Sequence, residues 1–317
     1  PEVLEVRDVP DVVPTFGHVR IRVTYAGVNR ADLLQRAGFY PPPENTPPDI
    51  PGLEYVGTID VVGPGVTRFK GGERVYGLVG GAAYAEYVVA HEREVALAPA
   101  SLSDELAGGA PEAFVTAYDA LVTRGRLQPG ERVLVHAAGS GVGTAGVQIA
   151  RALGCTVFGT SRTADKLERC KELGLDHGIV TTDGKFAEKI RECTSGKGVD
   201  VVLDLVGGGY VAETMIAAAK RARIVVVGLT GGASANLNLN LLLVKRIEII
   251  GTVLRSRPLE EKIEAAKMLE GTITQWLERG MVKPVIDRVF SMSEAAAAHE
   301  YVASNVSFGK VLLDMRV

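Results

Sequence analysis

The stretch RVLVHAAGSGVGTAGVQIA, residues 132–150, decides the fold of this chain. It joins a short apolar run, a glycine-rich turn and a helical segment in the order that a βαβ unit requires. Small residues from Ala137 to Gly146 let backbone amides at the helix start approach a pyrophosphate, whose charge the helix dipole stabilises. A dinucleotide-binding turn is therefore expected, against the alternative of a purely structural tight turn. The predicted contacts are Ser140, Gly141, Val142 and Gly143.

Outward from this turn, apolar runs alternate with helical segments between about Phe114 and Val253. This rhythm is typical of a parallel sheet covered by helices on both faces. It predicts a Rossmann doubly wound α/β domain over residues 114–253, with a helix at 164–173. The expected strands are 132–136, 156–160, 178–181, 199–205, 223–229 and 246–253.

The two flanking segments have a different character. Residues 1–113 are β-rich and punctuated by glycine and proline, and His18–Val23 alternates polar with apolar side chains as a half-buried strand does. Residues 254–317 predict a long amphipathic helix at 258–279, then two β segments near 285–290 and 310–313 with a helix between them. Because this tail cannot extend the parallel sheet, residues 1–113 and 254–317 are expected to form one β-rich substrate domain.

Composition excludes several classes of protein. The net charge of −3 leaves no basic footprint for nucleic acid, and the most apolar segment, 237–250, is interrupted by three charges and is too short to span a membrane. A chain of 317 residues suits two domains. Three cysteines without a CxxC pair form neither a disulfide framework nor a zinc lobe, so a cytoplasmic location is expected. The cysteines are Cys155, Cys170 and Cys193.

Charge after the second predicted strand indicates which cofactor binds. NAD-selective sites place a carboxylate on the ribose 2′-hydroxyl about 20 residues past the glycine turn. Arg162 and Lys166 stand in this region instead, and a 2′-phosphate prefers cationic donors. NADPH is therefore expected rather than NADH. The alternative is that both cations are ordinary solvated charges at a helix start, and Asp165 weakens their field.

Specific local matches now identify a resemblance. Residues 27–32 (GVNRAD) and 36–42 (RAGFYPP) resemble the substrate-side signature of the medium-chain dehydrogenase/reductase superfamily, and within it the quinone oxidoreductases; GLE at 52–54 with Gly57 resembles the turn and strand that follow. The glycine turn is similar to the family's AxxGxxG fingerprint, with Ser140 at the usual second glycine. That serine and LRSR at 254–257 give the nearest likeness to the p53-inducible quinone oxidoreductase subgroup. The resemblance implies a GroES-like substrate domain beside the Rossmann domain.

The resemblance also implies chemistry without zinc. Zinc-dependent relatives carry a cysteine where Asn29 stands, a histidine where Leu53 stands and a four-cysteine lobe near Glu92. A catalytic zinc needs about three protein ligands. No metal site is therefore expected. Some bacterial relatives have a tyrosine on the adenosine where this chain has Thr181, which puts part of that contact in doubt.

The resemblance further implies the residues around substrate and nicotinamide. Asn29 and Tyr40 would line the interdomain cleft beside the nicotinamide and donate to a substrate carbonyl. The alternatives are that Asn29 caps the helix starting at Arg30 and that Tyr40 only packs under the proline loop. The nicotinamide half would be held by Thr116, Gly228, Leu229, Thr230, Leu254 and Arg255.

Three functions remain open at this point. The first is NADPH-dependent reduction of a quinone by hydride transfer, in which the protein mainly aligns donor and acceptor. The second is reduction of the conjugated double bond of an enone or alkenal. The third is a non-catalytic, crystallin-like NADPH-binding protein. A homodimer is also expected, because the strand at 246–253 should lie at an edge of the sheet and offer unpaired backbone groups to a two-fold mate.

Overall fold

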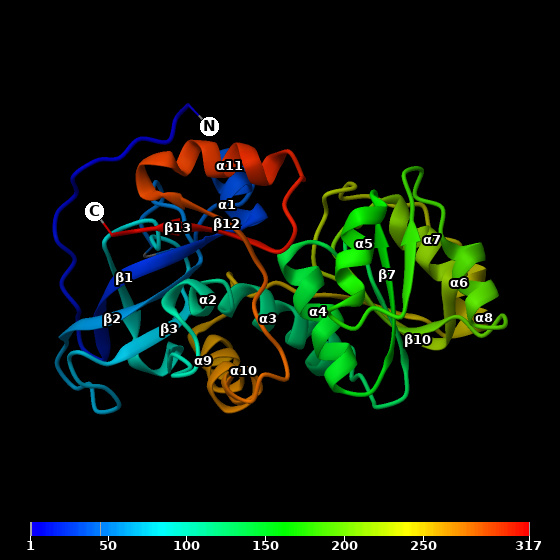
Figure 1. Cartoon of the computed structure of the whole chain (residues 1–317), viewed down its shortest axis with the longest axis horizontal. Helices are drawn as coiled ribbons and strands as arrows, with labels where there is room; N and C mark the ends of the chain where they lie inside the picture. Colours follow the sequence, from blue (N-terminus) through cyan, green and yellow to red (C-terminus); the bar gives the residue numbers. More distant parts are fainter. Residues whose placement is uncertain (1, 45, 317) are drawn as a thin grey trace. The chain divides into compact units, whose positions relative to one another are not determined.

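The computed structural model describes residues 2–44 and 46–316. Its chain forms two compact units, each with its own sheet (Figure 1). The first unit comprises Pro1–Val115 and Leu254–Val317, and the second comprises Thr116–Val253. Within the described residues, none of the helices is both long enough and apolar enough to cross a membrane.

The first unit is built on a seven-stranded sheet in the order β12-β13-β1-β2-β3-β5, with β4 also paired to β1. The C-terminal strands therefore return to the sheet begun near the N-terminus, as the sequence predicts. In the antiparallel pair of β1 and β13, Val28 lies opposite Val311. The strands are β1 His18–Val28, β2 Glu54–Val62, β3 Arg74–Leu78, β4 Tyr87–His91, β5 Val95–Leu97, β12 Ile286–Ser291 and β13 Lys310–Asp314.

Short helices surround this sheet. The predicted helix at 258–279 is present, but it is three consecutive helical segments, because a π-helical stretch separates two α-helical ones. The segments of this unit are α1 Arg30–Arg36, η1 Glu92–Glu94, α2 Asp104–Gly108, α9 Leu259–Met268, η3 Leu269–Ile273, α10 Thr274–Glu278, η4 Met292–Glu294 and α11 Ala295–Ala303. A further helix, α3 Pro111–Tyr118, begins in this unit and continues into the second.

The second unit has six parallel strands in the order β11-β10-β9-β6-β7-β8. Chain order reverses at β6, which lies between β7 and β9, so the doubly wound Rossmann topology is confirmed. The strands are β6 Arg132–Val135, β7 Thr156–Ser161, β8 His177–Val180, β9 Val199–Asp204, β10 Ala218–Val226 and β11 Glu248–Gly251. The helical segments are η2 Asp119–Arg124, α4 Gly141–Ala152, α5 Ala164–Lys171, α6 Ala187–Cys193, α7 Gly209–Ala217 and α8 Leu239–Lys245.

Two strands predicted for the second unit differ from the structure by more than one residue at their ends. The strand predicted at 223–229 is β10 and ends at Val226, because the amides of Val227 and Gly228 donate to the Asp204 carbonyl and turn the chain. The strand predicted at 246–253 is only Glu248–Gly251, because Arg246 takes a left-handed conformation (φ 54°) that ends α8. The helix predicted to run to residue 173 ends at Lys171.

His136, which follows β6, is a core residue with both ring nitrogens engaged. It is fully buried, and its two ring nitrogens lie 2.9 Å from the hydroxyls of Thr160 and Thr214. Burial lowers the pKa of His136 to about 4, against the opposing charge of Asp204. The neutral ring therefore ties β6 to β7 and α7 directly behind the glycine turn.

Candidate functional site

The glycine turn of the second unit is built to receive an anion. Ser140 is the N-cap of α4, and its Oγ accepts a hydrogen bond from the Gly143 amide at 3.0 Å. The amides of Gly141 and Val142 belong to the first helical turn, where no intrahelical acceptor exists. The serine at the usual glycine position therefore stabilises the helix start and leaves two first-turn amides for a phosphate.

Two glycines let α4 pack closely on the sheet. A Cβ atom on Gly143 would lie 2.3 Å from the Ala137 carbonyl oxygen. One on Gly146 would lie 2.6 Å from the Leu203 side chain of β9. No flexible side chain can relieve the first clash, because its partner is backbone. These are the contacts that glycines make in a dinucleotide-binding turn, so the residues present fit a pyrophosphate.

Positive charge follows the neighbouring strand. Arg162 is exposed just after β7, and Lys166 is half-buried in α5. Because β6 and β7 are parallel neighbours, both their carboxyl ends lie at the edge of the sheet where α4 begins. A hydrogen bond from Thr163 holds the pKa of Asp165 below its usual value, so its carboxylate stays charged and weakens the positive field.

Tyr210 of α7 is a residue of this edge that sequence reasoning missed. Burial raises the pKa of its hydroxyl, while a hydrogen bond with Thr181 and the charge of Arg162 act in the opposite direction. Tyr210 therefore brings an aromatic ring to the end of β8, where Thr181 itself is buried. The signal was not visible in the sequence, because Tyr210 lies about 30 residues further along the chain.

The other predicted cofactor residues of this unit lie at two places. Thr116 is buried on α3. Gly228, Leu229 and Thr230 form the loop after β10, where the Thr230 hydroxyl donates to the Leu205 carbonyl at 3.3 Å and Leu229 is 56% exposed. The loop thus joins the ends of β9 and β10 and presents an apolar side chain to its surroundings.

A buried ion pair organises the first unit. The Lys310 ammonium donates to Glu54 Oε1 at 2.6 Å and also to Asn29 Oδ1, while Asn29 Nδ2 donates to the same Glu54 oxygen at 2.9 Å. Glu54 is 0% and Lys310 4% exposed. The other Glu54 oxygen accepts from the Glu112 amide at 2.8 Å. The cluster therefore joins α1, β2, β13 and the start of α3.

The Asn29 amide is engaged within this cluster. Asn29 is also the N-cap of α1, and its backbone amide donates to Asp32 at 2.8 Å. Its second side-chain donor contact is to the Gly27 carbonyl at the longer distance of 3.3 Å. The predicted donation from Asn29 to a substrate carbonyl therefore requires this longer bond to be exchanged for one to the substrate.

These residues do not fit a zinc ion. The aliphatic side chain of Leu53 has no ligating atom and is 3% exposed, and the Glu54 carboxylate is already paired with the ammonium of Lys310. Among the described residues, no group of three or more histidine, cysteine, aspartate and glutamate side chains is arranged to hold a metal. The Lys310 ammonium instead donates to Asn29, the residue that the resemblance places at a zinc-ligand position.

Arg255 fixes the position of Tyr40. Its guanidinium donates to the Tyr40 carbonyl at 2.9 Å, to the Gly80 carbonyl at 2.7 Å and to Gln35 Oε1, and it lies 5.1 Å from the centre of the Tyr40 ring. Burial and the charge of Glu112 raise the pKa of Tyr40. Its hydroxyl therefore stays protonated and can donate a hydrogen bond. Arg255 is 7% exposed and acts as a clamp.

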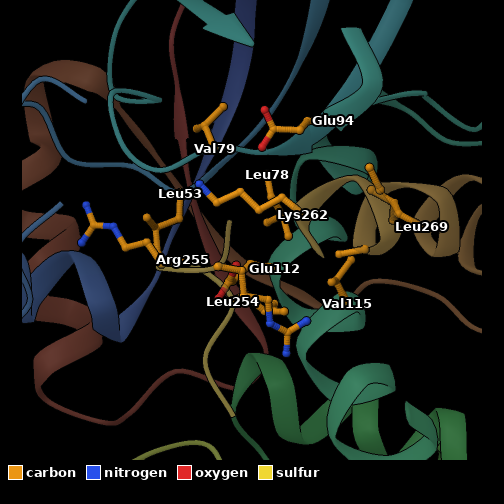
Figure 2. Close-up of a pocket in the computed structure, with 13 residues that line it drawn as sticks. Leu53, Leu78, Val79, Glu94, Glu112, Val115, Leu254, Arg255, Lys262 and Leu269 are labelled. Carbon is orange, nitrogen blue, oxygen red and sulfur yellow. The ribbon is translucent and has the colours of Figure 1, made fainter. Parts of the chain in front are cut away.

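An apolar pocket lies in the same unit. Its volume is about 540 Å³, including the solvent at its mouth, and Leu53, Leu254 and Arg255 are in its wall (Figure 2). The two predicted cofactor residues of this unit, Leu254 and Arg255, therefore share a pocket with the leucine at the zinc-ligand position. The lining residues are Leu53, Leu78, Val79, Glu94, Glu112, Val115, Leu254, Arg255, Arg257, Lys262, Ala265, Ala266 and Leu269.

Sequence reasoning missed three charged groups of this unit. Lys310 stands at the start of an apolar strand, where a lysine is ordinarily a solvated end residue. Glu94 and Lys262 lie about 170 residues apart and enter one pocket only because α9 packs against η1. No local pattern in the sequence carries this information.

Comparison with known proteins gives concordant matches. Residues 141–270 match the family described as zinc-binding dehydrogenase, and residues 16–100 match the alcohol dehydrogenase GroES-like domain. The chain is 33% identical to a quinone oxidoreductase of Rattus norvegicus, covering 99% of this chain and 94% of that protein. It is 32% identical to a 2-haloacrylate reductase of Burkholderia sp, covering 95% and 91%. Escherichia coli quinone oxidoreductase complexed with NADPH is 28% identical, with a TM-score of 0.88 over 99% of this chain and 96% of that one.

The buried ion pair gives a first prediction. Lys310→Met leaves the Glu54 carboxylate buried without its cation, so the free energy of unfolding of the first unit should fall by about 3–5 kcal/mol. Adding Glu54→Gln removes that charge, and the double variant should lose less than the sum of the two single losses. Urea unfolding followed by circular dichroism measures this, with the exposed Lys70→Met as control. Strictly additive losses would contradict the coupling.

Proposed function

Because the chain belongs to the quinone oxidoreductase family of the medium-chain dehydrogenase/reductase superfamily, we propose that it is an NADPH-dependent, zinc-independent quinone reductase. The observation that carries the proposal is the apolar pocket of the first unit, whose wall has Leu53 in place of a metal ligand and is flanked by the clamp of Arg255 on Tyr40. The three free cysteines suit a cytoplasmic location.

The reaction proposed is a balanced two-electron reduction. The quinone, NADPH and one proton give the hydroquinone and NADP⁺, and the bound cofactor supplies the hydride. The first-turn amides of α4 bind the pyrophosphate, and Arg162 and Lys166 bind the 2′-phosphate. Tyr40 donates a hydrogen bond to the substrate carbonyl. The nicotinamide half would be held by Thr116, Gly228, Leu229, Thr230, Leu254 and Arg255.

The second candidate is reduction of an activated carbon–carbon double bond. The similarity to a 2-haloacrylate reductase favours it, because the acceptor of that enzyme, as named, is a conjugated carbon–carbon double bond. Both candidate substrates are flat conjugated carbonyl compounds that an apolar pocket accepts. A non-catalytic NADPH-binding protein is the third candidate.

A side-by-side turnover assay decides among the three. With NADPH as donor, kcat/KM for 9,10-phenanthrenequinone should exceed that for methyl vinyl ketone by at least about tenfold, because a quinone needs little acid catalysis. Tyr40→Phe should lower kcat for the quinone, because it removes the hydroxyl that donates to the substrate carbonyl. It should keep NADPH affinity close to that of the unmodified protein, since the residues proposed for the pyrophosphate and the 2′-phosphate are in the second unit. Preference for the enone would establish the second candidate. Tight NADPH binding without turnover of either compound would establish the third.

Cofactor preference follows from the charges after β7. NADPH should bind at least about tenfold more tightly than NADH, because Arg162 and Lys166 offer charge-assisted hydrogen bonds to the 2′-phosphate. Lys166→Ala should weaken NADPH selectively. Lys171→Ala, a change one helical turn further along α5 at a lysine that forms an ion pair with Glu168, is the matched control and should change neither affinity. Equal affinities of the unmodified protein for the two cofactors, measured by calorimetric titration, would refute the assignment.

We also propose a homodimer that joins two sheets through β11. This strand is the edge of the sheet, and its neighbour α8 has no buried residue; Leu239, Leu243 and Val244 are each more than 60% exposed. The Thr252 amide donates to Val226 of β10. Because alternate residues of a strand point their amides to opposite sides, the Ile249 amide faces the open edge.

Light scattering at micromolar concentration tests the dimer. The expected mass is twice 33.6 kDa. Ile249→Pro should give monomers, because it removes an outward-facing donor while the bonds from β11 to β10 remain. Circular dichroism checks that the variant is folded. A fully active protein with a mass near 33.6 kDa would show that the edge needs no partner strand.

A further inference from the structure

Lys262 carries a positive charge into the apolar pocket of the first unit. Its side chain extends from α9 across the lining, and its nitrogen points toward Leu53 and Val79 (Figure 2). Among the residues that the structure describes, the Lys262 ammonium has no hydrogen-bond acceptor and no carboxylate within ion-pair distance. This lysine therefore differs from Arg255 in the same wall, whose donors bond to Gly80, Tyr40 and Gln35.

Glu94 shares the pocket but does not form an ion pair with Lys262. Burial raises the pKa of Glu94, and the charge of Lys262 acts against that rise. The two groups are thus close enough to interact electrostatically, yet within the described chain no direct salt bridge joins them. Figure 2 shows the Glu94 carboxylate near Val79, on the side toward which the lysine extends. A ligand oxygen bound here would lie near the Lys262 ammonium, which can donate a hydrogen bond, and near the Glu94 carboxylate.

The pocket lining combines residues from several segments of the first unit. Leu254 and Arg255, the residues expected beside the nicotinamide, share its wall with Lys262 of α9 and Leu269 of η3. Lys262 is half-buried, and its ammonium has no hydrogen-bond acceptor within the part of the chain that the structure describes. An acceptor oxygen of a bound ligand would give this ammonium a charge-assisted hydrogen bond.

We propose that Lys262 determines substrate specificity by donating a hydrogen bond to the second carbonyl oxygen of a para-quinone. The first carbonyl then lies toward Leu254, and the ring occupies the apolar wall formed by Leu53, Leu78 and Val79. A short enone has one carbonyl oxygen and leaves the ammonium without an acceptor. The inference rests on the proposed function and narrows it, because it assigns the pocket to para-quinones over compounds with a single carbonyl.

Binding of two matched ligands tests this without catalysis. One is 2,3-dimethyl-1,4-naphthoquinone, whose ring positions are blocked against thiol addition, and the other is 1-tetralone, which keeps the bicyclic frame with one carbonyl. Dissociation constants are measured by calorimetry on the full chain with NADP⁺ present. Lys262→Met should weaken binding of the quinone by about 10- to 100-fold and leave that of 1-tetralone unchanged. Lys267→Met, exposed on the same helix, is the matched control and should change neither.

Each other outcome has a definite meaning. If Lys262→Met weakens binding of both ligands equally, the lysine stem has a packing role. If it leaves quinone binding unchanged, the ammonium makes no contact with the quinone. Either result overturns the proposal. Selective loss of quinone binding in a protein that turns over no quinone with NADPH would retain the role of Lys262 and reject the proposed function. Turnover of quinones by the protein, together with no selective loss of quinone binding in Lys262→Met, would support the proposed function and reject the role of Lys262.

Discussion

The first unit depends on a positive charge that it buries and neutralises internally. Lys310, from the last strand of the chain, meets Glu54 of β2 and Asn29 at the start of α1, with almost no exposure to solvent. Removing either charge alone leaves the other buried without its counter-charge, so these segments are coupled. The C-terminal residues return to the N-terminal sheet through the pairing of β13 with β1, and Lys310 at the start of β13 places a cation beside Glu54. The same cation lies beside Asn29, the residue that the resemblance places at a zinc-ligand position, and this contact links the fold to the proposed zinc-independent chemistry.

The second unit is organised by the backbone geometry of its parallel sheet. Its carboxyl edge gathers the start of α4, the cations after β7 and the loop after β10, because parallel strands end on one side. Ser140 strengthens the helix start with its own oxygen and leaves first-turn amides for a phosphate. Neutral His136 braces the strands behind the turn. In the proposed function, the phosphates of the nucleotide bind to the second unit and the substrate binds to the first.

The sequence predicted most of what local patterns encode and little of what distant packing creates. The parallel sheet follows from periodicity and is confirmed. The structure also has the glycine turn at the start of α4 and pairs β13 of the tail with β1, while the binding role of the turn stays a prediction. The bounds of β10 and β11 were wrong, because a carbonyl of β9 and a left-handed Arg246 set them. Lys310, Tyr210 and Lys262 were missed because each acts through partners far along the chain. Asn29 was named from the resemblance, but only the structure shows that its amide is already shared with Glu54 and Lys310.

The central claim is that a lysine cation, and no metal, occupies the position beside Asn29 during quinone reduction. The direct measurement is the zinc content of the purified enzyme by elemental analysis, taken with its rate of NADPH oxidation by a quinone before and after treatment with a strong chelator. The account predicts far less than one zinc per chain and an unchanged rate. Stoichiometric zinc whose removal abolishes NADPH oxidation would contradict it.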